Sequence, residues 1–124
     1  MTTAPSAHLL AIAMLSADEG WAVGILGTIE RWHGGTWTVV PSGTHEELTG
    51  IAMRSADDGW IVGGSLALHW DGAAWSPAAT PSADGMEAVA AGPDAGEGWI
   101  VGAGHASPPL VLQDTPGGWR QVAT

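Results

Sequence analysis

Short apolar runs alternate along the chain with clusters of glycine, aspartate, serine and proline. In the stretch 48–85, the apolar runs occupy residues 48–53, 60–62, 65–70 and 74–76. A turn-forming cluster follows the first run, and Asp71 with Gly72 closes the third in the manner of a two-residue β-hairpin turn. No stretch has the periodicity of an amphipathic helix. The pattern predicts short antiparallel strands joined by tight turns.

The same pattern occurs three times, and the tryptophans mark its period. Trp21, Trp60 and Trp99 are spaced 39 and 39 residues apart, and a second set is spaced 38 and 44 apart at Trp37, Trp75 and Trp119. Residues 12–24 read IAMLSADEGWAVG, residues 51–63 read IAMRSADDGWIVG, and residues 89–102 read VAAGPDAGEGWIVG. The extra residues before Trp119 fall in 104–109, whose glycine and prolines predict a loop. The chain is therefore a repeat protein.

Four short strands in a unit of about 39 residues are typical of a β-propeller blade. The sequence predicts an all-β fold of three four-stranded antiparallel blades, half of a six-bladed propeller. The expected division is an N-terminal tail at 1–8 and blades at 9–47, 48–85 and 86–124.

The first strand of each unit has one face of small residues and one of bulky residues. Positions 11, 50 and 88 are Ala, Gly and Ala, and positions 13, 52 and 90 are all Ala, whereas Ile12, Ile51 and Val89 have the opposite parity. Such a strand suits the innermost place, where blades converge on the axis. The run 9–15 lacks the basic start of a signal peptide. With no transmembrane segment evident either, a cytoplasmic location is the default expectation.

The repeats resemble those of propellers of the photosystem II stability and assembly factor type. The matching residues in the first unit are 20–24 (GWAVG), 27–29 (GTI), Arg31 and 34–37 (GGTW). The resemblance covers nearly the whole chain and implies a propeller scaffold. Because these motifs belong to the scaffold, they indicate the fold far more strongly than a function.

Charge and composition exclude several classes of function. Three basic residues oppose 13 acidic ones, a net charge of −10, which disfavours binding to nucleic acid or to an anionic membrane. The chain has no cysteine for thiolate chemistry, no tyrosine for a sialidase-type nucleophile, and no HExxH or GxSxG motif. The acidic pairs Asp18–Glu19 and Asp57–Asp58, with Asp94 and Glu97, favour turn formation over calcium binding. We expect no enzyme activity, no cofactor and no metal.

The tryptophans that recur in every unit are interpreted as core wedges between blades, in preference to sugar-stacking platforms. Trp32 and Trp70 differ, because the third unit has Asp114 at their position. They are candidates for a binding surface, with partly exposed packing as the alternative. With a two-residue turn at 33–34 or 71–72, Trp32 shares a strand face with Glu30 and lies diagonal to Trp37, and Trp70 lies near Trp75 in the same way. Arg31 and His69 share another repeat position, where an inter-blade hydrogen bond is favoured over a ligand contact.

The sequence favours a non-catalytic binding or scaffold module for a protein or peptide. The first alternative is a carbohydrate-binding lectin with inter-blade pockets formed by Trp32, Trp70, Arg31, His69 and Glu30. The second is a fragment of a longer propeller. Closed propellers have roughly four to eight blades, so three blades leave an open ring. Two copies joined head to tail give six, and a homodimer is predicted.

Overall fold

A computed structural model describes residues 9–64, 66–78, 86–92, 98–102, 110–115 and 118–122. Strands account for most of them, with one short 3-10 turn, η1 (Ile25–Gly27). The predicted tail at 1–8, the loop at 104–109 and the acidic positions Asp94 and Glu97 lie outside the described residues.

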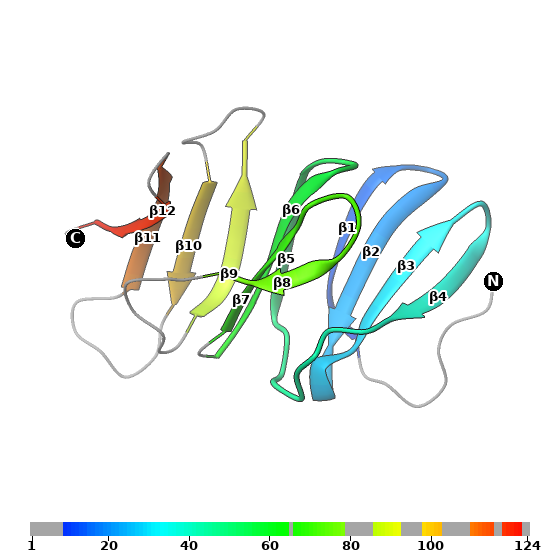
Figure 1. Cartoon of the computed structure of the whole chain (residues 1–124), viewed down its shortest axis with the longest axis horizontal. Coiled ribbons are helices and arrows are strands. Elements are labelled where there is room, and N and C mark those ends of the chain that lie inside the picture. The colour runs from blue at the N-terminus through cyan, green and yellow to red at the C-terminus, as the bar shows by residue number, and fades with distance from the viewer. Residues whose placement is uncertain are drawn as a thin grey trace.

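The described residues form three separate antiparallel sheets, each of four strands that follow one another in sequence. Blade 1 contains β1 (Leu9–Ser16), β2 (Glu19–Gly24), β3 (Ile29–His33) and β4 (Thr36–Val40). Blade 2 contains β5 (Gly50–Ser55), β6 (Asp58–Gly63), β7 (Leu66–Trp70) and β8 (Trp75–Pro77). Blade 3 contains β9 (Met86–Ala91), β10 (Gly98–Gly102), β11 (Leu110–Thr115) and β12 (Gly118–Gln121). The sheets stand side by side in chain order (Figure 1), which confirms the predicted all-β fold class of four-stranded blades. The exact blade limits at 9–47, 48–85 and 86–124 stay predictions.

The first strands of the three blades, β1, β5 and β9, lie next to one another. Their small residues permit this approach. A Cβ atom added at Gly50 would lie 3.0 Å from the Cα atom of Ala88, so a larger side chain there would separate two blades. Thr49 also bridges them, because its hydroxyl donates to the carbonyl oxygen of Glu87 over 2.8 Å. The predicted inner position of the small-residue strand is thus confirmed.

Each blade has a forward face, toward the next blade in the chain, and a rear face, toward the previous one. The forward face of blade 1 and the rear face of blade 2 share one hydrophobic cluster, which includes Trp21, Ile51 and Trp75. The forward face of blade 2 and the rear face of blade 3 share a second cluster, which includes Val62 and Trp119. The core therefore consists of two layers, one in each joint between blades.

Both predicted hairpin turns are wrong by one or two residues. In blade 1, Gly34 and Gly35 form the turn, because both have the positive φ that a tight hairpin requires, 60° and 90°. In blade 2, the turn runs over four residues, since the Asp71 side chain accepts hydrogen bonds from the backbone N–H groups of Ala73 and Ala74. The tryptophans of each hairpin, at 32 and 37 and at 70 and 75, are consequently directly opposite each other and not diagonal.

Candidate functional site

The two candidate binding tryptophans have the same local contacts but different exposure. Trp32 donates its indole N–H to the carbonyl oxygen of Ala17 over 3.0 Å, and Trp70 donates to Ala56 over 2.9 Å. Trp70 is only 4% exposed, because Trp21 of the preceding blade packs against it with the ring centres 4.8 Å apart. Trp32 stays half-buried. Only Trp32 of the pair presents appreciable surface to a ligand.

The guanidinium of Arg31 lies over two indole rings at the joint between blades 1 and 2. Its central carbon is 5.1 Å from the ring centre of Trp21 and 5.8 Å from that of Trp70. Its charge is paired within blade 1, where it donates to Glu19 over 3.1 Å. The inter-blade contact of Arg31 is thus a cation–π interaction, and the hydrogen bond expected between blades lies within one blade.

A charged network joins blades 2 and 3. Arg54 on β5 donates to Asp58 over 2.7 Å and to Asp114 on β11 over 3.1 Å, and it also donates to the carbonyl oxygen of Gly92. Partial burial opposes the charge of Arg54, but the hydrogen bond and charge of Asp114 and of Asp58 outweigh it and raise its pKa. The network acts as a clamp between blades.

His69 belongs to the edge of this network. Its Nε2 atom lies 2.7 Å from Asp58, and its ring centre lies 4.4 Å from that of Trp60 in the same blade, with the two rings tilted by 42°. The hydrogen bond predicted to run between blades is therefore again within one blade. Glu30, 1% exposed, lies on the rear face of blade 1 in the place that Leu68 occupies in blade 2.

The structure thus distributes the five candidate residues over two blades. It brings Arg31 next to Trp70, places Glu30 and Trp32 on one strand face, and buries both Glu30 and Trp70. A ligand role for these five residues stays a prediction.

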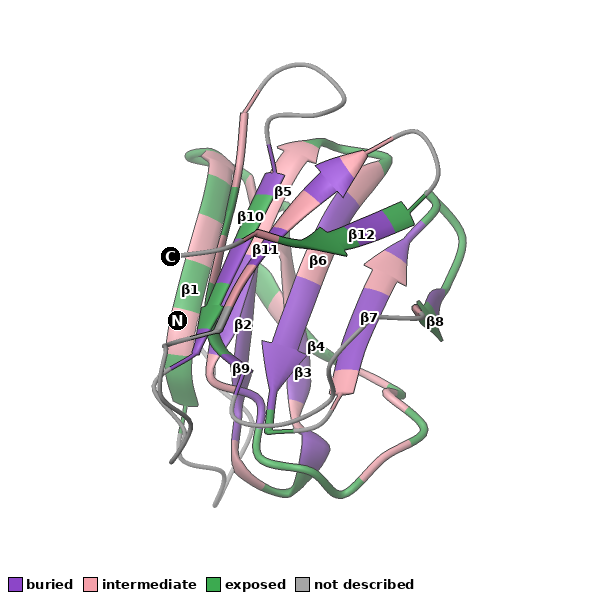
Figure 2. Ribbon diagram, turned by 90° about the vertical axis from the view of Figure 1, so that its left-hand side faces the viewer, coloured by how far each residue is buried: buried purple, intermediate pink, exposed green. Residues whose placement is uncertain are grey.

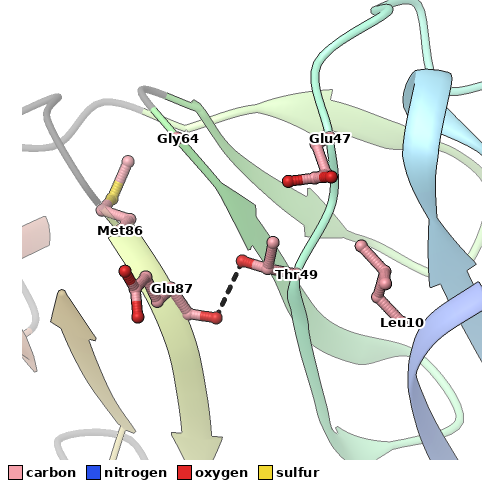
Figure 3. Close-up of a pocket in the computed structure, with 6 residues that line it drawn as sticks. All are labelled: Leu10, Glu47, Thr49, Gly64, Met86 and Glu87. Atoms are coloured by element: carbon pink, nitrogen blue, oxygen red, sulfur yellow. Dashed lines mark hydrogen bonds between the residues drawn. The ribbon is translucent and has the colours of Figure 1, made fainter. Parts of the chain in front are cut away.

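A groove that no motif predicted lies where the inner strands begin. It has a volume of about 590 Å³ and draws its lining from all three blades (Figure 3), with Leu10, Glu47, Thr49, Gly64, Met86 and Glu87 around it. Leu10 stands on one side of the opening, and Met86 with Glu87 stands on the other. Positions 10, 49 and 87 are equivalent in the three units, which is the signal that the sequence offered.

The backbone around the groove is held firmly, because blades 2 and 3 exchange hydrogen bonds there. Gly64 and Met86 each donate an N–H group to the carbonyl oxygen of the other, over 3.1 and 2.9 Å. Gly64 has a φ of 57°, and a Cβ atom added there would lie 2.8 Å from a carboxylate oxygen of Glu46. The groove thus combines a fixed floor with the exposed carboxylates of Glu47 and Glu87, and that of Glu46 lies beside it.

The described residues contain no group of three histidine, aspartate or glutamate side chains placed to hold a metal ion. Within the same ranges, no helix has the length and apolar character needed to cross a membrane. The groove has an acidic and apolar lining, which suits binding of a complementary surface.

Solved structures that share this fold include two of YCF48. The structure of YCF48 from Cyanidioschyzon merolae is 23% identical with a TM-score of 0.72, and the match covers 98% of this chain and 39% of that one. The structure of YCF48 bound to D1 peptide is 22% identical with a TM-score of 0.71, with 93% and 40% covered. The chain spans about two fifths of the length of these structures. No protein-family model matches the sequence, and no curated protein does. The likeness confirms the predicted propeller fold and its resemblance to propellers of the photosystem II assembly factor type.

Proposed function

We propose that this chain is a non-catalytic propeller module that binds a protein or peptide segment carrying basic and apolar side chains. The groove at the start of β1, β5 and β9 carries the proposal. It is large enough for several side chains, at about 590 Å³, and three blades contribute to it. A similar propeller, YCF48, has been solved with a D1 peptide, which supports a peptide as the class of ligand.

Charge selects the kind of peptide. Glu47 and Glu87 line the groove, Glu46 lies beside it, and the residues that line it include no basic side chain. The chain as a whole carries a net charge of −10. A segment containing arginine or lysine is therefore attracted to the groove, while the exposed side chain of Leu10 offers apolar contact.

Fluorescence anisotropy with a labelled peptide of alternating leucine and arginine tests this proposal. We expect this peptide to bind saturably, with an affinity that falls as the salt concentration rises. A control peptide of alternating leucine and glutamate should not bind. The double variant Glu47→Gln/Glu87→Gln should raise the Kd about tenfold.

Asp18→Asn/Asp57→Asn provides a matched control, because it removes the same charge from the turns at the far ends of β1 and β5. Equal weakening by both double variants would contradict a site in the groove and leave only attraction to net charge. A glycan that binds while the peptide does not would favour the lectin alternative.

We also propose that a second copy of the chain is the partner of the two end blades, giving a six-bladed ring. The free rear face of blade 1 exposes apolar residues that blade 2 buries, since Ile12 is 61% exposed and the equivalent Ile51 is 8% exposed. Light scattering should then give twice the chain mass of 12.6 kDa. A mass of one chain would favour the alternative of a piece of a longer propeller.

A further inference from the structure

The exposed large apolar residues of the described ranges gather at the two ends of the molecule. Blade 1 exposes five of them on β1 and β4, namely Leu9, Leu10, Ile12, Met14 and Val39. Blade 3 exposes Trp99 and Val101 on β10. The remaining exposed large apolar residue of the described ranges is Leu26, which lies in η1 and not on a strand. Both ends therefore carry unpartnered apolar surface.

The two joints within the chain show how a forward face meets a rear face. At the first joint, Trp21 meets Trp75 edge-on at 5.3 Å and 88°, next to its contact with Trp70. At the second joint, Trp60 meets Trp119 in the same way, at 4.9 Å and 78°. In each joint, the tryptophan of the second strand inserts against the hairpin of the following blade.

The two free ends have the two halves of such a joint. On blade 3, Trp99 pairs with Ala90 and Gln113 in the sheet, in the same register as Trp21 with Ala13 and Arg31. It is 39% exposed, whereas Trp21 is 0% exposed.

On blade 1, the rings of Trp32 and Trp37 lie 5.3 Å apart at 48°. Those of Trp70 and Trp75 lie 5.4 Å apart at 41°. The receiving pair on the free rear face thus has the geometry of the occupied pair in blade 2.

The residue at the end of the inner strand supports the same match. Where the following blade carries Asp114, the inner strand carries Arg54 as its partner. In the first joint, where the following blade carries Trp70, the inner-strand residue of blade 1 that is equivalent to Arg54 is the uncharged Leu15. Blade 3 has the uncharged Gly92 at this position. Its matching neighbour is therefore a blade with tryptophan at the Trp70 position, and in blade 1 that residue is Trp32.

We infer that Trp99 of one copy packs against the Trp32–Trp37 pair of a second copy, as Trp21 packs against Trp70 and Trp75. This inference rests on the proposed ring. The contact is heterologous, so two copies close a ring when each forward face meets the other's rear face. Six blades lie within the usual range for propellers, which favours a second copy as the occupant.

Light scattering tests the contact by measuring the mass of each variant at one fixed concentration. We expect Trp99→Glu and Ile12→Glu each to halve the mass, because each places a carboxylate in the apolar joint. Both side chains are exposed in the single chain, so a cooperative melt should persist. Leu26→Asn is the control, because it removes an exposed apolar side chain at a φ of 57° that asparagine tolerates, and it should keep the mass of two chains.

Mixing the two monomeric variants provides the sharper test. One joint in the mixed pair has an unchanged Trp99 facing an unchanged rear face, so the mass of two chains should return. A mixture that stays monomeric overturns the inference, as does a dimer that Trp99→Glu leaves intact or a mass that grows beyond two chains. A wild-type chain with the mass of one chain overturns the ring and this contact together.

Discussion

The two joints of the molecule use one backbone plan and two kinds of chemistry. The joint between blades 1 and 2 is aromatic, with Trp21 packed against both Trp70 and Trp75. The joint between blades 2 and 3 keeps one such tryptophan contact but replaces Trp70 by Asp114, which pairs with Arg54. The comparison teaches that the repeat fixes the placement of a joint, while two linked positions decide whether packing or charge closes it.

The largest effect should follow loss of the tryptophan in the aromatic joint. Trp21→Ala removes a fully buried indole and leaves a cavity, so the free energy of unfolding should fall by about 3–5 kcal/mol. Urea melts in the Ile12→Glu background, where the ends are free, measure it. The same change at the exposed Trp99 is the control and should cost much less. Equal losses would contradict a specific joint at Trp21.

The ionic joint should be weaker and sensitive to salt. Asp114→Ala leaves Arg54 without one of its carboxylate partners, at a site where both side chains are about nine-tenths covered. The free energy of unfolding should therefore fall by about 2 kcal/mol. Urea melts at low and high salt measure the loss, which should shrink as salt rises. A loss that salt leaves unchanged would point to packing of Asp114 instead of charge.

Converting one joint into the other sharpens the comparison. The double variant Arg54→Leu/Asp114→Trp gives the second joint the residue types of the first. We expect the double variant to lose less free energy of unfolding than the two single variants lose together. A double-mutant cycle in urea measures this coupling energy. Additive losses would show that the two positions are not linked.

The smallest effect should come from the turn that positions Trp75. Backbone N–H groups of Ala74 and then Ala73 hold the pKa of Asp71 below its ordinary value, so the ionised side chain favours the folded state. This contribution is present above the ordinary aspartate pKa and is lost as the pH falls through the lowered pKa. Asp71→Ala should therefore lower the Tm slightly at neutral pH and hardly at all in strong acid.

Asp71→Asn is the control for that experiment, because its amide oxygen accepts the same hydrogen bonds without titrating. It should keep most of the stability of the wild-type chain at neutral pH. A difference between Asp71→Ala and wild type that persists in acid would mean that the carboxylate charge contributes nothing.

The sequence predicted the blades because their signals are local and repeated. Trp21, Trp60 and Trp99 mark the period, and the small residues at positions 11, 50 and 88 mark the inner strands. The turns were placed less well, because the Asp71 side chain lengthens one hairpin through hydrogen bonds that composition does not reveal.

The site was harder to predict because it depends on contacts between units. Trp32 and Trp70 have the same sequence signal, yet only Trp70 is buried, since only it has a preceding blade. The groove lies at equivalent positions 10, 49 and 87, but these hold Leu, Thr and Glu, so no shared residue type marks them.

Blade 2 contributes to both core layers, and this gives the molecule an uneven capacity to open. Along β6, Ile61 faces one cluster and Val62 the other, and Figure 2 shows this strand mostly buried while β1 alternates between intermediate and exposed residues. An end blade can fray and leave one core layer intact, as in other repeat proteins. Blade 2 cannot unfold without the loss of both core layers, so the stability of this middle blade determines the cooperative unfolding of the chain.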